Sequence, residues 1–224
     1  MTVMRDPPRR FRLLVFDWDG TLADSTGIIA GAIQLACHDL GLPVPDDTAA
    51  RFVIGLGLCD AIRHVAPTLQ PASYAQLSER YRYHYLARDP DIPLFMGARE
   101  MLAELEGRGF LLAIATGKSR VGLDRALAQQ RIAHRFVASR CADEGFPKPH
   151  PDMLLALMDR VGVEAAETLM IGDTTHDLEL ARNAGVSALA VSYGAHAVAG
   201  FAELSPIATV NSIAELKAWL AANA

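Results

Sequence analysis

Aspartates directly follow short apolar runs at two places in this 224-residue chain. Asp17 and Asp19 come after the run 13–16, and Asp173 comes one glycine after the run 168–171. If the runs are parallel strands, their carboxyl ends meet at one sheet edge, and the three carboxylates would repel one another there. Mg²⁺ suits such a group together with waters and a phosphate oxygen. A lone aspartate is more often a helix cap or turn residue, but that role does not account for three at strand ends.

The elements that would position these residues alternate between strand and helix. Near-continuous apolar runs predict strands buried on both faces at 13–16, 111–115, 136–138, 168–171, 187–191 and 208–210. Helical periodicity predicts helices at 98–106, 151–161 and 176–184. This alternation indicates an α/β protein with a Rossmann-like, doubly wound parallel sheet.

The segment from about residue 23 to residue 93 breaks this alternation. It has no convincing strand, and its pattern predicts helices at 27–40, at 58–65 and after Pro71. We therefore expect an α-helical cap domain at 24–93, inserted into a core made of 1–23 and 94–224. Tyr81 and Tyr85 belong to a helical stripe that favours helix packing over a stacking platform.

Four segments resemble, in order, the motifs of the haloacid dehalogenase-like superfamily of phosphotransferases. They are Asp-Trp-Asp-Gly-Thr at 17–21, Thr-Gly-Lys at 116–118, Lys148 within 146–152, and Gly-Asp-Thr-Thr-His-Asp at 172–177. The helical segment after the first motif is similar to the cap of the phosphoglycolate phosphatase-like group. Glycine-rich cap segments such as 55–58 face the active site in that group, although helix punctuation is the commoner role of such glycines.

The resemblance implies catalytic roles for four residues. Asp17 would attack phosphorus and form an aspartyl-phosphate. Asp19 would protonate the leaving alkoxide and later take a proton from the attacking water. Lys148 would neutralise charge and bind phosphate, and the Thr116 hydroxyl would hold a phosphoryl oxygen.

The same resemblance implies a Mg²⁺ site and further phosphate contacts. The ligands would be the carboxylates of Asp17 and Asp173 and the backbone carbonyl of Asp19, with Asp177 orienting a metal-bound water or Lys148. The backbone amides of Gly117 and Trp18 would also bind phosphate. Both residues depart from the family pattern: asparagine is common at the first position, and leucine or methionine at the second.

We expect a Mg²⁺-dependent phosphatase that hydrolyses a small phosphomonoester, with phosphoglycolate as the leading candidate. Asp19 argues against dehalogenase chemistry, because dehalogenases of the superfamily lack this second aspartate. A sugar-phosphate mutase stays open, although the histidine typical of those members near the first motif is absent and the next one is His38. A non-catalytic phosphate-binding protein is the third alternative, but it would need neither Asp17 nor Asp19.

Composition excludes several other classes of protein. The net charge of -5 leaves no basic field for nucleic acid, and the cluster of Arg5, Arg9 and Arg10 is typical of a solvated tail. No run approaches the roughly 18 apolar residues of a membrane span. Three cysteines without a Cys-x-x-Cys motif predict buried, reduced thiols. The expected protein is cytoplasmic, a monomer or homodimer, and acts on a small phosphorylated metabolite, with no nucleic-acid or membrane partner.

Overall fold

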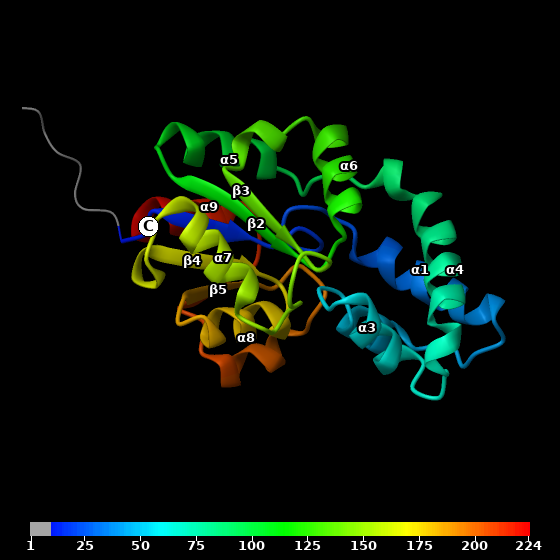
Figure 1. Ribbon diagram of the computed structural model, residues 1–224. Helices are drawn as coiled ribbons and strands as arrows, with labels where there is room; N and C mark the ends of the chain where they lie inside the picture. The colour runs from blue at the N-terminus through cyan, green and yellow to red at the C-terminus, as the bar shows by residue number, and fades with distance from the viewer. Residues whose placement is uncertain (1–9) are drawn as a thin grey trace, which may run out of the picture.

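The computed structural model describes residues 10–224, and a six-stranded sheet in the order β3-β2-β1-β4-β5-β6 forms its centre (Figure 1). The strands are β1 (Leu13–Phe16), β2 (Leu111–Thr116), β3 (Ala138–Cys141), β4 (Thr168–Gly172), β5 (Ser187–Val191) and β6 (Ala208–Val210). Every pairing is parallel. The predicted doubly wound α/β sheet is confirmed.

The register of the central strands explains why distant motifs meet. Phe16 at the end of β1 pairs with Ile114 of β2 on one side and with Ile171 of β4 on the other. The carboxyl ends of these three strands therefore lie within two residues of the same level. Asp17 is fixed there by its amide, which donates to the Ile171 carbonyl at 2.9 Å.

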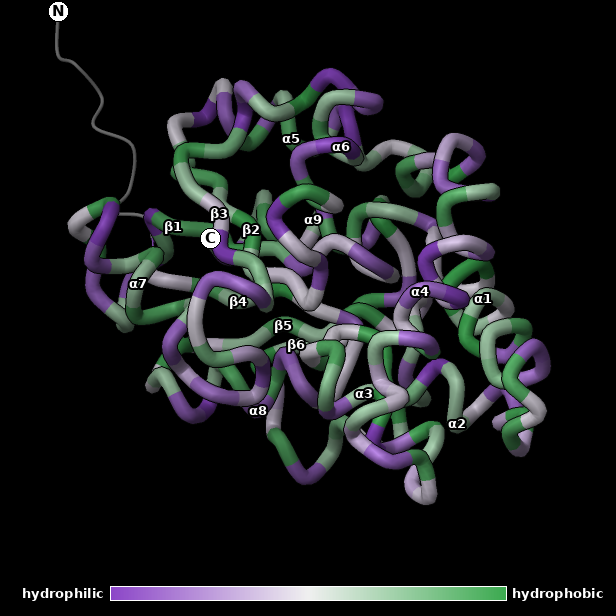
Figure 2. Tube along the Cα trace, turned by 45° about the vertical axis from the view of Figure 1, so that its right-hand side comes forward, coloured by the Kyte–Doolittle hydropathy of each residue, from purple (hydrophilic) through white to green (hydrophobic). Residues whose placement is uncertain are grey.

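Helices cover both faces of the sheet because its strands are apolar on both sides. One face packs against α5 (Ala98–Gly107), α6 (Arg120–Gln130) and α9 (Ile213–Asn223). The other packs against α7 (Asp152–Val161) and α8 (Thr175–Asn183). Figure 2 shows these outer helices alternating between hydrophobic and hydrophilic residues, as expected of helices with one buried face.

A helical cap lies beyond the carboxyl ends of the strands, on the right of Figure 1. It consists of α1 (Thr26–Asp39), α2 (Asp47–Phe52), α3 (Leu58–Val65) and α4 (Tyr74–Leu86), which pack around small apolar clusters of their own. The chain enters and leaves the cap at adjacent points, since the Asp24 amide donates to the Pro93 carbonyl at 3.0 Å. The division at residues 24 and 93 stays a prediction. Short 3-10 turns occupy Pro71–Ser73, Asp89–Asp91, Ala133–Arg135, Ala165–Glu167 and Val198–Leu204.

The structure differs from several sequence predictions. The third strand is Ala138–Cys141 and not 136–138, because this edge strand has two partly buried polar residues in its middle and Val137 before it is 46% exposed. Helices α2, α6 and α9 were not predicted. Cys59 is exposed, whereas the prediction that thiols are buried holds for Cys37 and Cys141.

Residues 1–9, which begin the range assigned to the core and include Arg5 and Arg9 of the basic cluster, lie outside the described residues, and Arg10 is exposed. Within 10–224, no helix is long and apolar enough to cross a bilayer.

Candidate active site

Lys148 lies fully buried between two carboxylates below the cap. Its Nζ is 2.6 Å from Asp177 Oδ1 and 2.9 Å from Asp17 Oδ1. Burial alone would lower the pKa of Lys148, but the charges of Asp17 and Asp177 outweigh it and the pKa is raised. This lysine therefore stays cationic, next to the side chain predicted to attack phosphorus.

Asp17 is a buried carboxylate that lacks hydrogen bonds. Lys148 Nζ is close to Oδ1 but out of line for a hydrogen bond, and Oδ2 has no partner among residues 10–224. Burial raises the pKa of Asp17 to about 7, Lys148 opposes this rise, and the charges of Asp177 and Asp19 add to it. Buried carboxylate oxygens without hydrogen-bond partners are suited to a cation and to an incoming electrophile.

Asp173 is held rigidly beside Asp17. Thr21 Oγ1 donates to its Oδ1 at 2.7 Å, and the Ala195 amide donates to its Oδ2 at 2.7 Å. Burial, followed by the charges of Asp17 and Asp177, raises the pKa of Asp173 well above its ordinary value. Gly20 has a φ of +83°, and a Cβ there would lie 2.2 Å from Asp173 Oδ2, so this turn requires glycine.

Asp177 has both of its oxygens engaged. Oδ2 accepts from the Thr174 amide at 3.0 Å and from the Thr174 hydroxyl at 2.7 Å, in a capping box at the start of α8, while Oδ1 accepts from Lys148. Asp177 thus positions Lys148, and the catalytic importance of this contact stays a prediction. The sequence analysis did not identify Thr21 and Thr174 as site residues, although Thr21 lies in the first motif and Thr174 in the fourth.

The residues fit a magnesium ion. Oxygens of Asp17, Asp173 and Asp177 all lie within 4.8 Å of one another, and those of Asp17 still need a partner. This group contains the carboxylates of Asp17 and Asp173, which were predicted as ligands, and adds that of Asp177. The role predicted for the Asp19 backbone carbonyl stays a prediction.

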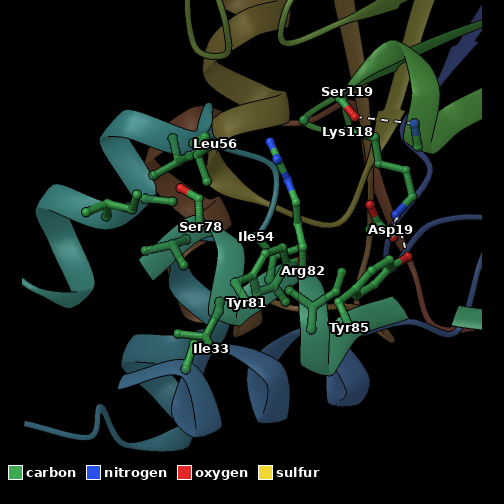
Figure 3. Close-up of a pocket in the computed structure, with 18 of the residues that line it drawn as sticks. Asp19, Ile33, Ile54, Leu56, Ser78, Tyr81, Arg82, Tyr85, Lys118 and Ser119 are labelled. Carbon is green, nitrogen blue, oxygen red and sulfur yellow. Dashed lines mark hydrogen bonds and ion pairs between the residues drawn. The ribbon is translucent and has the colours of Figure 1, made fainter. Parts of the chain in front are cut away.

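Asp19 instead points toward the cap, where Lys118 holds it. Lys118 Nζ is 3.0 Å from Asp19 Oδ1, and the Ser25 hydroxyl donates to the same oxygen at 2.7 Å. The lysine also donates to the Tyr85 hydroxyl of α4 at 2.8 Å, an arrangement visible in Figure 3. Sequence analysis did not assign Lys118 a function; its only signal is that it directly follows Thr116 and Gly117.

The predicted phosphate contacts gather at the end of β2 and after β1. Thr116 is fully buried, and its hydroxyl accepts from the Lys118 amide at 3.2 Å. A Cβ on Gly117 would lie 2.7 Å from the carbonyl of Gly55 in the cap, so the departure from asparagine is required by this close approach. The Trp18 side chain is 2% exposed and packs in the core, so only its backbone is left for phosphate and its bulk does not obstruct the cap.

Comparison with known proteins agrees with this geometry. The model of a family described as haloacid dehalogenase-like hydrolase matches residues 14–191. The chain belongs to this family. A protein named "Probable phosphatase IndB" from Dickeya dadantii is 36% identical over 210 residues, covering 91% of each chain. A phosphoglycolate phosphatase from Vibrio parahaemolyticus is 31% identical, covering 95% of this chain and 97% of its own.

Solved structures share the fold of this haloacid dehalogenase-like hydrolase. A haloacid dehalogenase-like family hydrolase from Streptococcus pneumoniae has a TM-score of 0.81 at 25% identity, with 94% of this chain and 98% of the other covered. A hydrolase from Pseudomonas syringae, at 22% identity, has a TM-score of 0.85 and covers 93% of this chain and 97% of its own. The predicted family and its capped fold are confirmed.

In this haloacid dehalogenase-like hydrolase, two buried histidines fasten the cap to the core. The Phe52 carbonyl, at the end of α2, lies 2.8 Å from His176 Nε2 and 3.0 Å from His196 Nε2. The Thr175 amide donates to His196 Nδ1, so the proton of this ring is on Nε2. Burial lowers the pKa of His176, and burial with the neighbouring His176 lowers that of His196 to about 4.

A cavity of about 580 Å³ separates the cap of this hydrolase from the predicted catalytic residues (Figure 3). Asp19, Gly117 and Lys118 are at its inner end, and Gly55, Leu56 and Leu58 of the glycine-rich segment line it as well. Tyr81 and Tyr85 contribute both to helix packing and to the cavity wall.

Proposed function

We propose that this chain is a Mg²⁺-dependent phosphomonoester hydrolase that acts through an aspartyl-phosphate on Asp17. The observation that carries the proposal is the buried Asp17 carboxylate, whose Oδ1 pairs with the Lys148 ammonium at 2.9 Å and whose Oδ2 has no partner among residues 10–224. An oxygen free of donors remains nucleophilic, and the adjacent cation favours the approach of a phosphate dianion. The names of the Dickeya and Vibrio relatives support phosphatase activity.

Phosphoryl transfer would proceed in two steps on this chain's own residues. An Asp17 oxygen forms a bond to phosphorus while the bond to the leaving oxygen breaks, and Asp19 gives that oxygen a proton. Lys118 then pairs with the Asp19 carboxylate that results, as it does in the structure. A water next attacks phosphorus, loses its proton to Asp19 and releases Asp17 and inorganic phosphate.

Several groups neutralise the negative charge of the phosphoryl group during both steps. The Lys148 ammonium, the Thr116 hydroxyl and the Gly117 amide hold the phosphoryl oxygens. Asp17 and Asp173 would hold Mg²⁺, which when bound supplies positive charge to the phosphate and to the carboxylates. Asp177 keeps Lys148 in place throughout. Among small phosphomonoesters, phosphoglycolate is the first candidate because several relatives carry the name phosphoglycolate phosphatase.

Phosphate release from p-nitrophenyl phosphate and from phosphoglycolate tests this proposal. We expect turnover with Mg²⁺, loss of turnover in EDTA, and a loss of at least about 1000-fold in Asp17→Asn. Asp159→Asn, an equivalent change at an exposed position of α7, serves as the matched control and should keep full activity. Undiminished turnover in Asp17→Asn or in EDTA would overturn the proposed mechanism.

A further inference from the structure

We infer that the preferred substrate of this chain is a phosphomonoester whose leaving group is a large, mainly apolar body, either aromatic or aliphatic. This inference rests on the phosphomonoester hydrolysis proposed above. It concerns the cavity of about 580 Å³ between cap and core, whose inner end is formed by Asp19, Gly117 and Lys118. A leaving group must occupy this space, since Asp19 is the residue proposed to protonate it.

The size of the cavity does not come from a raised cap. The cap touches the core on opposite sides of the site: at Phe52 with the two histidines, and at Tyr85 with Lys118. Between these points, a Cβ on Gly57 would lie 2.9 Å from Pro147, and Gly55 is in similarly close contact with Gly117. The space therefore remains while the cap is seated against the core.

The walls of the cavity are mostly apolar where the cap forms them. They include Ile33 and Ala36 from α1, Ala61 and Ile62 from α3, and Leu77 and Tyr81 from α4. Ser78 and Arg82 of α4 are the polar cap side chains in this lining. The apolar side chains stabilise apolar surface removed from water. The recognition chemistry of the cap is therefore mainly hydrophobic.

Volume leads to the same conclusion. Pockets of about 300–1,000 Å³ enclose ligands of drug size, and this cavity is within that range. Glycolate has two carbons and would fill a small part of it. At about 30 Å³ per water molecule, most of the apolar space would then have to stay hydrated, which is unfavourable. A leaving group that fills the space displaces this water and gains contact with all three helices.

A series of primary alkyl phosphates tests the inference, because their leaving groups differ in length but little in basicity. We expect kcat/KM of the wild-type enzyme to rise from ethyl to hexyl phosphate by up to about fourfold per methylene, mainly through KM. Hexyl phosphate should exceed phosphoglycolate at least tenfold. A flat series, or a preference for phosphoglycolate, overturns this inference and leaves the proposed hydrolase intact. Failure to turn over any ester with Mg²⁺ overturns both.

Filling the cavity provides a second test. Ala61→Phe places a ring among the lining side chains of α3, and the increase of kcat/KM with chain length should disappear. Ala75→Phe makes the same change at an exposed position of α4 outside the lining and should retain the increase. Thermal unfolding of both variants confirms that they fold. An unchanged increase in folded Ala61→Phe overturns the inference, and the wild-type series decides alone if this variant does not fold.

Discussion

The buried site of Asp17, Lys148, Asp173 and Asp177 forms a charged floor below the cavity, and this floor and the cap differ in how they hold polar groups. On the floor, Lys148, Asp173 and Asp177 are buried, and each is fixed by charged or hydrogen-bonding partners at 2.6–3.0 Å. In the cap, the wall is mostly apolar. Arg82 of α4, which extends along the pocket in Figure 3, is the only charged lining side chain with no partner among residues 10–224.

This difference assigns the chemical step to the floor and the choice of substrate to the cap. A buried polar network tolerates little change, because removing one partner leaves another charge uncompensated. Replacing one hydrophobic side chain of an apolar wall by another costs little stability. Substrate preference can therefore change in the cap while the geometry around Asp17 stays fixed. Each of the following experiments tests one side of this comparison or the boundary between them.

Removing the cation of the floor should have the largest effect. In Lys148→Met, Asp17 and Asp177 lose the charge that neutralises them, so we expect phosphatase turnover to fall at least about 100-fold. The free energy of unfolding should fall by about 3–5 kcal/mol, as measured by urea denaturation without Mg²⁺. Lys217→Met is the matched control, since Lys217 pairs with Glu104 at the surface, where both side chains are 44% exposed. That pair should contribute at most about 1 kcal/mol. Equal losses in the two variants would show that the floor is no more constrained than the surface.

The boundary between floor and cap should be the next most sensitive place. In Gly117→Asn the new Cβ would lie 2.7 Å from the Gly55 backbone, so the cap must move away from the core. We expect kcat/KM to fall about tenfold, a loss equivalent to about 1.4 kcal/mol of transition-state stabilisation, with a similar unfolding midpoint.

Gly31→Ala controls for the loss of a glycine in the cap. No atom lies within 4 Å of a Cβ at this position in the middle of α1. It should keep its activity and gain about 0.5–1 kcal/mol in stability, because glycine is unfavourable inside a helix. Full activity in Gly117→Asn would mean that the contact with Gly55 does not set the cap position.

The pH dependence of Mg²⁺ binding tests the charged floor, and its expected effect is smaller than those of the substitutions above. Asp17 and Asp173 have raised pKa values in the folded protein without metal, so the folded state holds more protons than the unfolded state. Their burial therefore lowers the stability of the metal-free protein as pH rises from about 4 to about 7, the pKa of folded Asp17. Mg²⁺ competes with these protons.

We expect saturating Mg²⁺ to raise the unfolding temperature by about 5 °C at pH 8 and by much less at pH 5.5. Differential scanning calorimetry at the two pH values provides the measurement, and Asp17→Asn should reduce the shift at pH 8. Shifts of the same size at both pH values would show that the ion does not bind at these carboxylates.

Sequence patterns located most strands because they are largely apolar. The predicted bounds of β1, β5 and β6 match the structure. Edge strand β3 was misplaced because Ser139 and Arg140 interrupt its apolar character. Helix α6 was missed because it contains Gly122 and buries only Leu123, Ala126 and Leu127. Such elements lack the long apolar face by which a helix or a buried strand is recognised in a sequence.

The candidate site was predictable only where its residues follow strands. Asp17, Thr116 and Asp173 come together because the register of a parallel sheet aligns the ends of its strands. The contact between Lys118 and Asp19 was not predictable, because it depends on how Tyr85 of the cap sits over the core. The apolar cavity likewise depends on the packing of helices that a sequence pattern can identify but cannot place.

The Phe52 carbonyl has a consequence for the dynamics of the enzyme. It belongs to the last residue of α2, a helix of six residues whose final carbonyls have no partners within the helix. The core histidines supply the missing donors. Helices this short are marginal in water, so raising the cap also uncaps α2 and promotes local unfolding. Amide hydrogen exchange in α2 would then report how often the enzyme opens.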